Sequence, residues 1–95
     1  MAKVKNLPIF NQLRKYRKAR GLNQCQVARI LGLADSSSVS QWERGVCLPS
    51  LKNLFRLAAL YRTLVDALYI DTLRKIRKEI QRREVDLKPH KANAR

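Results

Sequence analysis

Residues 21–45, GLNQCQVARILGLADSSSVSQWERG, contain two short helical patterns joined by a turn. Asn23 is a favourable N-cap for the first helix, and Gly32 is a favourable stop. Between them the inward positions recur at helical spacing: Val27, Ala28 and Leu31. The stretch therefore predicts a first helix of less than three turns.

The second pattern of this stretch is shorter. Asp35 or Ser36 can cap a helix that ends at Gly45, with Val39 and Trp42 facing the core. Two short helices joined in this way can place the second helix in the major groove of DNA while the first braces against the DNA backbone. The spacing permits this arrangement without proving it.

Two more helices are predicted around this pair. One occupies residues 8–19 and ends at Gly21; its inward positions are Ile9, Leu13 and Tyr16. On the other side a link over residues 46–50 contains Pro49, and Ser50 caps a fourth helix. The inward stripe of that helix is formed by Leu51, Leu54, Leu57, Ala58 and Tyr61.

A fifth helix is predicted from an acidic capping box formed by Thr63 and Asp66, with Val65 and Leu68 inward. No stop signal follows before the low-complexity basic tail that starts near Pro89. Strand patterns and internal repeats are absent from the sequence.

Residues 70–88 read as an amphipathic helical extension with one apolar stripe, formed by Ile70, Leu73, Ile76 and Ile80. This stripe must cover something apolar, either its own domain or a second copy of the chain, because two heptads are too few to specify a coiled coil. A membrane-surface helix is a third alternative. A dimer surface would combine apolar residues of two helices: Phe55, Leu60, Leu64, Leu73, Ile76 and Ile80.

The charge of the chain points to a polyanionic partner. Twenty-one Lys and Arg residues stand against seven Asp and Glu residues, giving a formal charge of +14 in 95 residues. Residues 1–32 hold eight basic residues and no acidic one, and residues 70–95 hold nine basic residues against four acidic ones. Nucleic acid is the first candidate partner.

Several motifs resemble the Cro and phage-repressor helix-turn-helix family, most clearly over residues 13–68. They are Gly21-Leu22-Asn23-Gln24, Val27-Ala28, Leu31-Gly32, Val39-Ser40-Gln41-Trp42-Glu43-Arg44-Gly45 and Pro49-Ser50-Leu51. The resemblance implies an all-α, compact five-helix domain with an extended C-terminal helix, and a DNA-binding transcriptional regulator, most simply a repressor. We expect a basic arm (1–7), the helix-turn-helix DNA-binding domain (8–69), the extension (70–88) and a basic tail (89–95).

The resemblance also assigns the recognition helix to residues 36–43. Its small or amide-bearing outward residues suit close approach to base edges, and Gln41 can pair with N6 and N7 of adenine. We expect base contacts from Ser36, Ser37, Ser38 and Gln41.

Phosphate contacts are expected where helices begin or end, because free backbone N–H groups and the helix dipole favour an anion there. The candidates are Asn23, Gln24, Ser40, Arg44, Lys52 and Asn53. Arg44, Lys52 and Asn53 could equally be solvated surface residues.

The family also pairs an arginine of its first helix with the glutamate of the Trp-Glu-Arg-Gly segment, so we expect a structural ion pair between Arg17 and Glu43. Three departures from the family pattern are visible. The turn between Gly32 and Val39 is one residue longer, Cys25 stands where the family often has an acid, and Arg62 stands where it often has glycine.

Other classes of protein fit less well. An antitoxin that neutralises a toxin through its extension is the main alternative. A basic RNA-associated protein is another, although no run of aromatic residues for base stacking is present. We expect no enzyme, cofactor or metal site, since the single histidine, His90, lies in the tail. Without a membrane-spanning or signal segment, and with Cys25 and Cys47 read as reduced, a cytoplasmic protein is expected.

Overall fold

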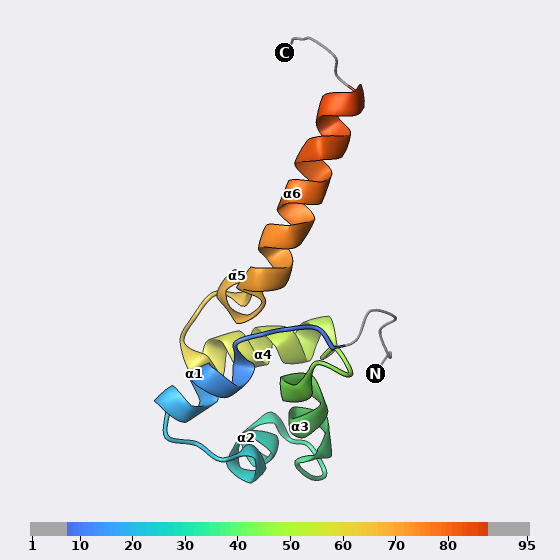
Figure 1. The fold of residues 1–95 in the computed structure, drawn as a ribbon. Helices are drawn as coiled ribbons and strands as arrows, with labels where there is room; N and C mark the ends of the chain where they lie inside the picture. Colours follow the sequence, from blue (N-terminus) through green and yellow to red (C-terminus); the bar gives the residue numbers. More distant parts are fainter. Residues whose placement is uncertain (1–7, 88–95) are drawn as a thin grey trace.

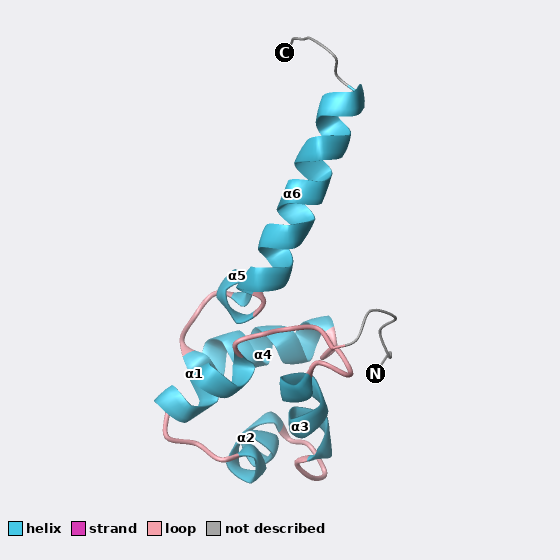
Figure 2. Ribbon diagram, viewed as in Figure 1, coloured by secondary structure: helices cyan, strands magenta, loops and turns pink. Residues whose placement is uncertain are grey.

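The computed structural model describes residues 8–87, which form six helices and no strand (Figures 1 and 2). The helices are α1 (Leu13–Ala19), α2 (Gln24–Leu31), α3 (Ser37–Arg44), α4 (Leu51–Tyr61), α5 (Val65–Leu68) and α6 (Ile70–Leu87). The first five pack together, and α6 extends from them as a long arm (Figure 1). The predicted fold class, an all-α domain with an extended C-terminal helix, is confirmed.

Local capping explains where most helices begin. Asn23 Oδ1 accepts from the backbone N–H of Gln26, and Gln26 Oε1 accepts from the backbone N–H of Asn23, which makes a complete capping box for α2. Ser50 Oγ accepts from the N–H of Asn53 at the start of α4. These two predicted caps are confirmed.

The start of α3 is capped from one residue further back. Ser36 occupies the N-cap position but makes no side-chain cap, whereas Asp35 Oδ1 accepts from the N–H of Ser37 at 2.8 Å. This hydrogen bond lowers the pKa of the Asp35 carboxyl because it favours the ionised form. Of the two residues expected to cap α3, Asp35 supplies the hydrogen bond.

The first helix is shorter than predicted, because α1 begins at Leu13 and residues 8–12 are not helical. Asn11 is the reason. Its Oδ1 accepts from the N–H of Leu13, and its Nδ2 donates to the carbonyl oxygens of Ile9 and Trp42. The amide side chain thus caps α1 and ties the preceding segment to α3.

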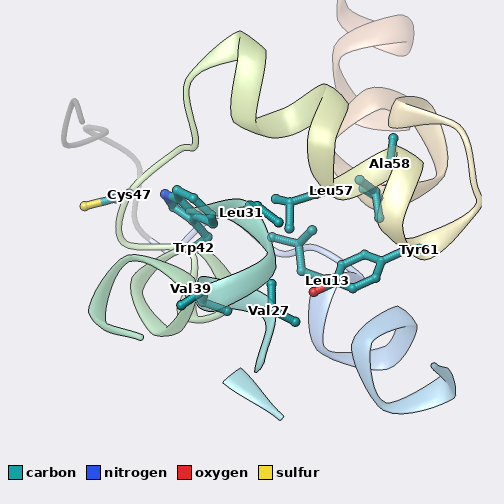
Figure 3. Close-up of a cluster of buried hydrophobic side chains, with 11 residues drawn as sticks. Leu13, Val27, Leu31, Val39, Trp42, Cys47, Leu57, Ala58 and Tyr61 are labelled. Carbon is teal, nitrogen blue, oxygen red and sulfur yellow. The ribbon is translucent and has the colours of Figure 1, made fainter. Parts of the chain in front are cut away.

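The core lies where α1, α2, α3 and α4 meet, and Figure 3 shows side chains from all four helices converging there. Its largest fully buried members are Trp42, Leu13, Leu57, Leu68, Val27 and Val39. One predicted core residue is wrong. Leu51, the first residue of α4, is 68% exposed.

The chain between α4 and α6 also differs from the prediction. Thr63 and Asp66 form no capping box, since the N-cap of α5 is Leu64 and it receives no side-chain hydrogen bond. The short α5 stops at Tyr69, whose φ of −127° and ψ of 37° break the helix before α6. The continuous fifth helix that the periodicity predicted is therefore two helices.

The long helix α6 is attached to the domain by its first turn. Gln12 Nε2 donates to Asp71 Oδ2 at 3.0 Å, and Thr72 Oγ1 donates to the carbonyl of Phe10 at 3.3 Å. None of its 18 residues is buried. Within residues 8–87, no helix combines the length and apolar character needed to cross a membrane.

Candidate nucleic-acid interface

A groove of about 600 Å³ lies between the start of α2 and one side of α3. Residues of α1, α2 and α3 line it: Arg14, Arg17, Asn23, Gln24, Cys25, Ser36, Ser40, Glu43 and Arg44. Apart from Cys25 the lining residues carry polar or charged side chains, and three of them are arginines. This groove and the adjoining surface of α3 form the candidate interface.

The outward side of α3 remains open to solvent. Ser37 and Arg44 are exposed, and four further polar residues are partly exposed: Ser36, Ser38, Ser40 and Gln41. Ser36, Ser40 and Arg44 recur every four residues and line the groove together. Ser37, Ser38 and Gln41 lie outside the groove lining, on other positions of the same helix.

The N-terminal turn of α2 contributes two of the expected phosphate contacts, but their side chains are already engaged. Asn23 Oδ1 serves the capping box, and Gln24 Nε2 donates to Glu43 Oε1 at 3.0 Å. A primary amide nitrogen has two hydrogens, so Gln24 keeps one for another acceptor. Lys52 and Asn53, at the start of α4, are not part of the groove.

Arg17 and Glu43 form the expected ion pair. Arg17 Nε and Nη2 donate to the two Glu43 carboxylate oxygens at 2.6 and 3.2 Å, and Arg17 Nη1 donates to the carbonyl of Leu22 at 2.9 Å. The side chains are only 10% and 5% exposed. The pair therefore joins α1, the turn before α2 and α3 within the wall of the groove.

The same carboxylate organises the charge in this region. Hydrogen bonding to Glu43 raises the pKa of the Arg17 guanidinium because it favours the charged form. Because Glu43 also accepts from Gln24, one buried carboxylate holds an arginine of α1 and an amide of α2 in place. The structure thus gives Glu43 a positioning role that the motif alone did not reveal.

Sequence reasoning missed two groove residues, Arg14 and Cys25. Arg14 is an outward residue of the first helix and lies one turn before Arg17, on a neighbouring face. That spacing was the available signal. Cys25 is exposed, Cys47 is buried, and both are free thiols.

The residues expected on a dimer surface do not gather in one place. Leu60 lines a shallow hollow with Ile30 and Leu31, whereas Leu64 lines a different hollow with Tyr16 and Ile70. Phe55 is 57% exposed on α4. Leu73, Ile76 and Ile80 follow the α6 stripe.

Residues 8–87 hold no cluster of three or more residues able to bind a metal ion. His90, the basic arm (1–7) and the basic tail (89–95) lie outside the described residues.

Comparison with known protein families identifies the family of this chain. A protein-family model described as "Helix-turn-helix" matches residues 13–68, more than half of the chain. This segment begins with α1 and ends with α5. A search of curated proteins finds no match.

Proposed function

The chain belongs to the helix-turn-helix family of DNA-binding transcription regulators, and from this we propose that it recognises a specific sequence in duplex DNA and represses transcription there. In this proposal α3 enters the major groove, and the start of α2 lies against the phosphate backbone. A protein bound in this way represses by blocking access to the promoter. We place this activity in the cytoplasm.

The single observation that carries the proposal is the uncovered polar side of α3. Val39 and Trp42 anchor the helix in the core, so its opposite side is held rigidly toward solvent. No other part of residues 8–87 buries that side, and the arginines of the adjoining groove, Arg14 and Arg44, supply positive charge beside it. A helix that reads base edges needs both features.

The side chains then divide into two roles. Gln41 is the proposed base reader, with Ser36, Ser37 and Ser38 as further base contacts. Arg44, Ser40 and Gln24 hold phosphates along the groove, with Arg14 as an added contact. Asn23 contributes through the helix start that it caps, and Lys52 with Asn53 through the start of α4.

The test compares Gln41→Ala with Arg44→Ala on duplexes selected from a random pool at physiological salt. Loss of a paired base contact costs about 1–3 kcal/mol of discrimination, so Gln41→Ala should bind the selected site and altered sites with similar affinity. Arg44→Ala should weaken binding to every duplex and lower the salt slope by about one. Equal losses from Gln41→Ala on all sequences would contradict the base-reading role.

A matched control is Arg82→Ala, because Arg82 is another exposed arginine but lies on α6, outside the groove. We expect its affinity and salt slope to equal those of the parent chain. An equal loss from Arg44→Ala and Arg82→Ala would indicate attraction by overall charge alone, and would contradict the proposed interface.

A further inference from the structure

The segment before α1 bonds to two separate parts of the molecule. Residues 9–12 are not helical, and Figure 1 shows them within the blue trace that runs from the end of α3 toward α1. Ile9 and Asn11 bond to the end of α3. Phe10 and Gln12 bond to the junction of α5 and α6. Neighbouring residues thus bond alternately to two different elements, and we call residues 9–12 the strap.

We propose that the strap couples α6 to α3, so that loss of its hydrogen bonds to α6 weakens the binding of α3 to DNA. The effect on DNA rests on the proposed function. The coupling itself rests on the hydrogen bonds along the two sides of the strap.

Three hydrogen bonds among the described residues join the strap to the α5–α6 junction. The N–H of Gln12 donates to the carbonyl of Leu68, the last residue of α5, at 2.8 Å. Gln12 Nε2 donates to Asp71 Oδ2 at 3.0 Å, and Thr72 Oγ1 donates to the carbonyl of Phe10 at 3.3 Å. Asp71 and Thr72 belong to the first turn of α6. The position of the strap and that of the first turn of α6 are therefore fixed together.

The other side of the strap bonds to the last turn of α3. The N–H of Ile9 donates to the carbonyl of Gly45 at 2.9 Å, and Asn11 Nδ2 donates to the carbonyl of Trp42 at 3.0 Å. Arg44 lies between these two carbonyls in the chain. A shift of the strap therefore moves the backbone that carries a proposed phosphate contact.

The strap is braced from within. Asn11 Nδ2 also donates to the carbonyl of Ile9 at 3.1 Å, and Asn11 Oδ1 accepts from the N–H of Leu13 at 3.0 Å. The peptide unit between Phe10 and Asn11 is planar and rigid, and its carbonyl is the acceptor for Thr72 Oγ1. Bonds to α6 and bonds to α3 thus meet on adjacent peptide units, where a shift on one side displaces the other.

Two matched double variants test the coupling. The removal variant, Asp71→Ala/Thr72→Val, lacks both side-chain groups of α6 that bond to the strap. The retention variant, Asp71→Asn/Thr72→Ser, keeps an acceptor for Gln12 Nε2 and a hydroxyl for the carbonyl of Phe10. Both variants lose the same single negative charge, so they differ in their hydrogen bonds to the strap and have equal net charge. Thermal melting verifies that each variant is folded.

Amide hydrogen exchange of the full chain without DNA gives the first result. Exchange at the Ile9 N–H should be about three- to tenfold faster in the removal variant than in the retention variant, because the strap then separates from Gly45 more often. The range corresponds to the loss of one ordinary hydrogen bond. The N–H of Val27, which donates to the carbonyl of Asn23 in α2, is the internal control and should exchange alike in both variants.

Equal exchange at Ile9 in the two variants overturns the coupling. Acceleration by the same factor at Ile9 and Val27 also overturns it, because the lost hydrogen bonds would then stabilise the whole domain without a specific link to α3.

Binding to a duplex selected from a random pool tests the consequence for DNA. The removal variant should bind several-fold more weakly than the retention variant, since a less fixed α3 loses more freedom on binding. Overall charge predicts no difference, because both variants lack the Asp71 carboxylate. Equal affinities in a chain that binds selectively overturn the proposal. If no variant binds any duplex selectively but exchange at Ile9 still differs, the proposed function fails and the coupling stands.

Discussion

Gly45 lies directly against the backbone of Ile9. The Ile9 N–H donates to the Gly45 carbonyl at 2.9 Å, and a Cβ added to Gly45 would stand 2.7 Å from Ile9 N. Gly45 also has a φ of +77°, so it both ends α3 in the left-handed region and leaves room for the segment before α1. The end of α3 and the approach to α1 are therefore built as one unit.

This contact predicts that Gly45→Ala is far more damaging than Gly32→Ala. Both glycines have a φ of +77°, but a Cβ at Gly32 meets no atom within 4 Å. Gly32→Ala should cost only the left-handed conformation, about 1–2 kcal/mol. Gly45→Ala adds a backbone clash, for a total of roughly 2–5 kcal/mol. Urea unfolding measures both, and equal free energies of unfolding for the two variants would show that the contact with Ile9 is unimportant.

The two ion pairs of the described residues should differ sharply in their contribution to stability. Glu43→Ala leaves the Arg17 guanidinium buried without its partner, which should cost on the order of 3–5 kcal/mol. Glu79→Ala breaks the exposed pair with Arg83 and should cost less than about 0.5 kcal/mol. Thermal and urea unfolding of both variants provide the comparison. If the melting curve of Glu43→Ala matched that of the parent chain, the ion pair would have no structural role.

Local signals in the sequence predicted much of this fold. Asn23, Ser50, Gly32 and Gly45 each act within a few residues, through caps or left-handed backbone, and all four mark helix ends in the structure. The Arg17–Glu43 pair was expected only from the family resemblance, because residues so far apart in the chain carry no local signal.

The errors arose where distant residues decide local structure. Asn11 delays the start of α1 by bonding to the carbonyl of Trp42, which is 31 residues away, and helical periodicity does not contain that contact. The break at Tyr69 likewise could not be predicted, because no glycine or proline marks it in the sequence. The groove depends on the packing of three helices, so Arg14 was identified only from the structure.

Arg62 should be replaceable by glycine with a gain in stability. It is the only residue other than glycine with a positive φ among the described residues, at 56°, and it is the C-cap of α4. An L side chain is strained there, so Arg62→Gly should raise the free energy of unfolding by up to about 1 kcal/mol. Arg56→Gly, on the exposed side of α4, should instead lower it by about 1 kcal/mol. Chemical unfolding of the two variants should thus give shifts of opposite sign, and a loss of stability in Arg62→Gly would contradict the strain.

Stability should fall at alkaline pH because two tyrosines have buried hydroxyls. The hydroxyls of Tyr61 and Tyr69 have no hydrogen-bond partner, and burial raises the pKa of each to about 12. A tyrosine of the unfolded chain ionises near pH 10, so between pH 10 and 12 the folded state holds more protons and stability falls as pH rises. At pH 11 the ionisation of each tyrosine should have lowered the free energy of unfolding by roughly 1 kcal/mol relative to neutral pH. The double variant Tyr61→Phe/Tyr69→Phe shares all other ionisable groups, so its free energy of unfolding should fall less steeply from pH 9 to 11. It should also be at least as stable as the parent chain at pH 7, because a hydroxyl buried without a hydrogen bond costs free energy that phenylalanine avoids. Parallel pH profiles for the two proteins would show that these hydroxyls ionise as readily in the folded chain as in the unfolded one.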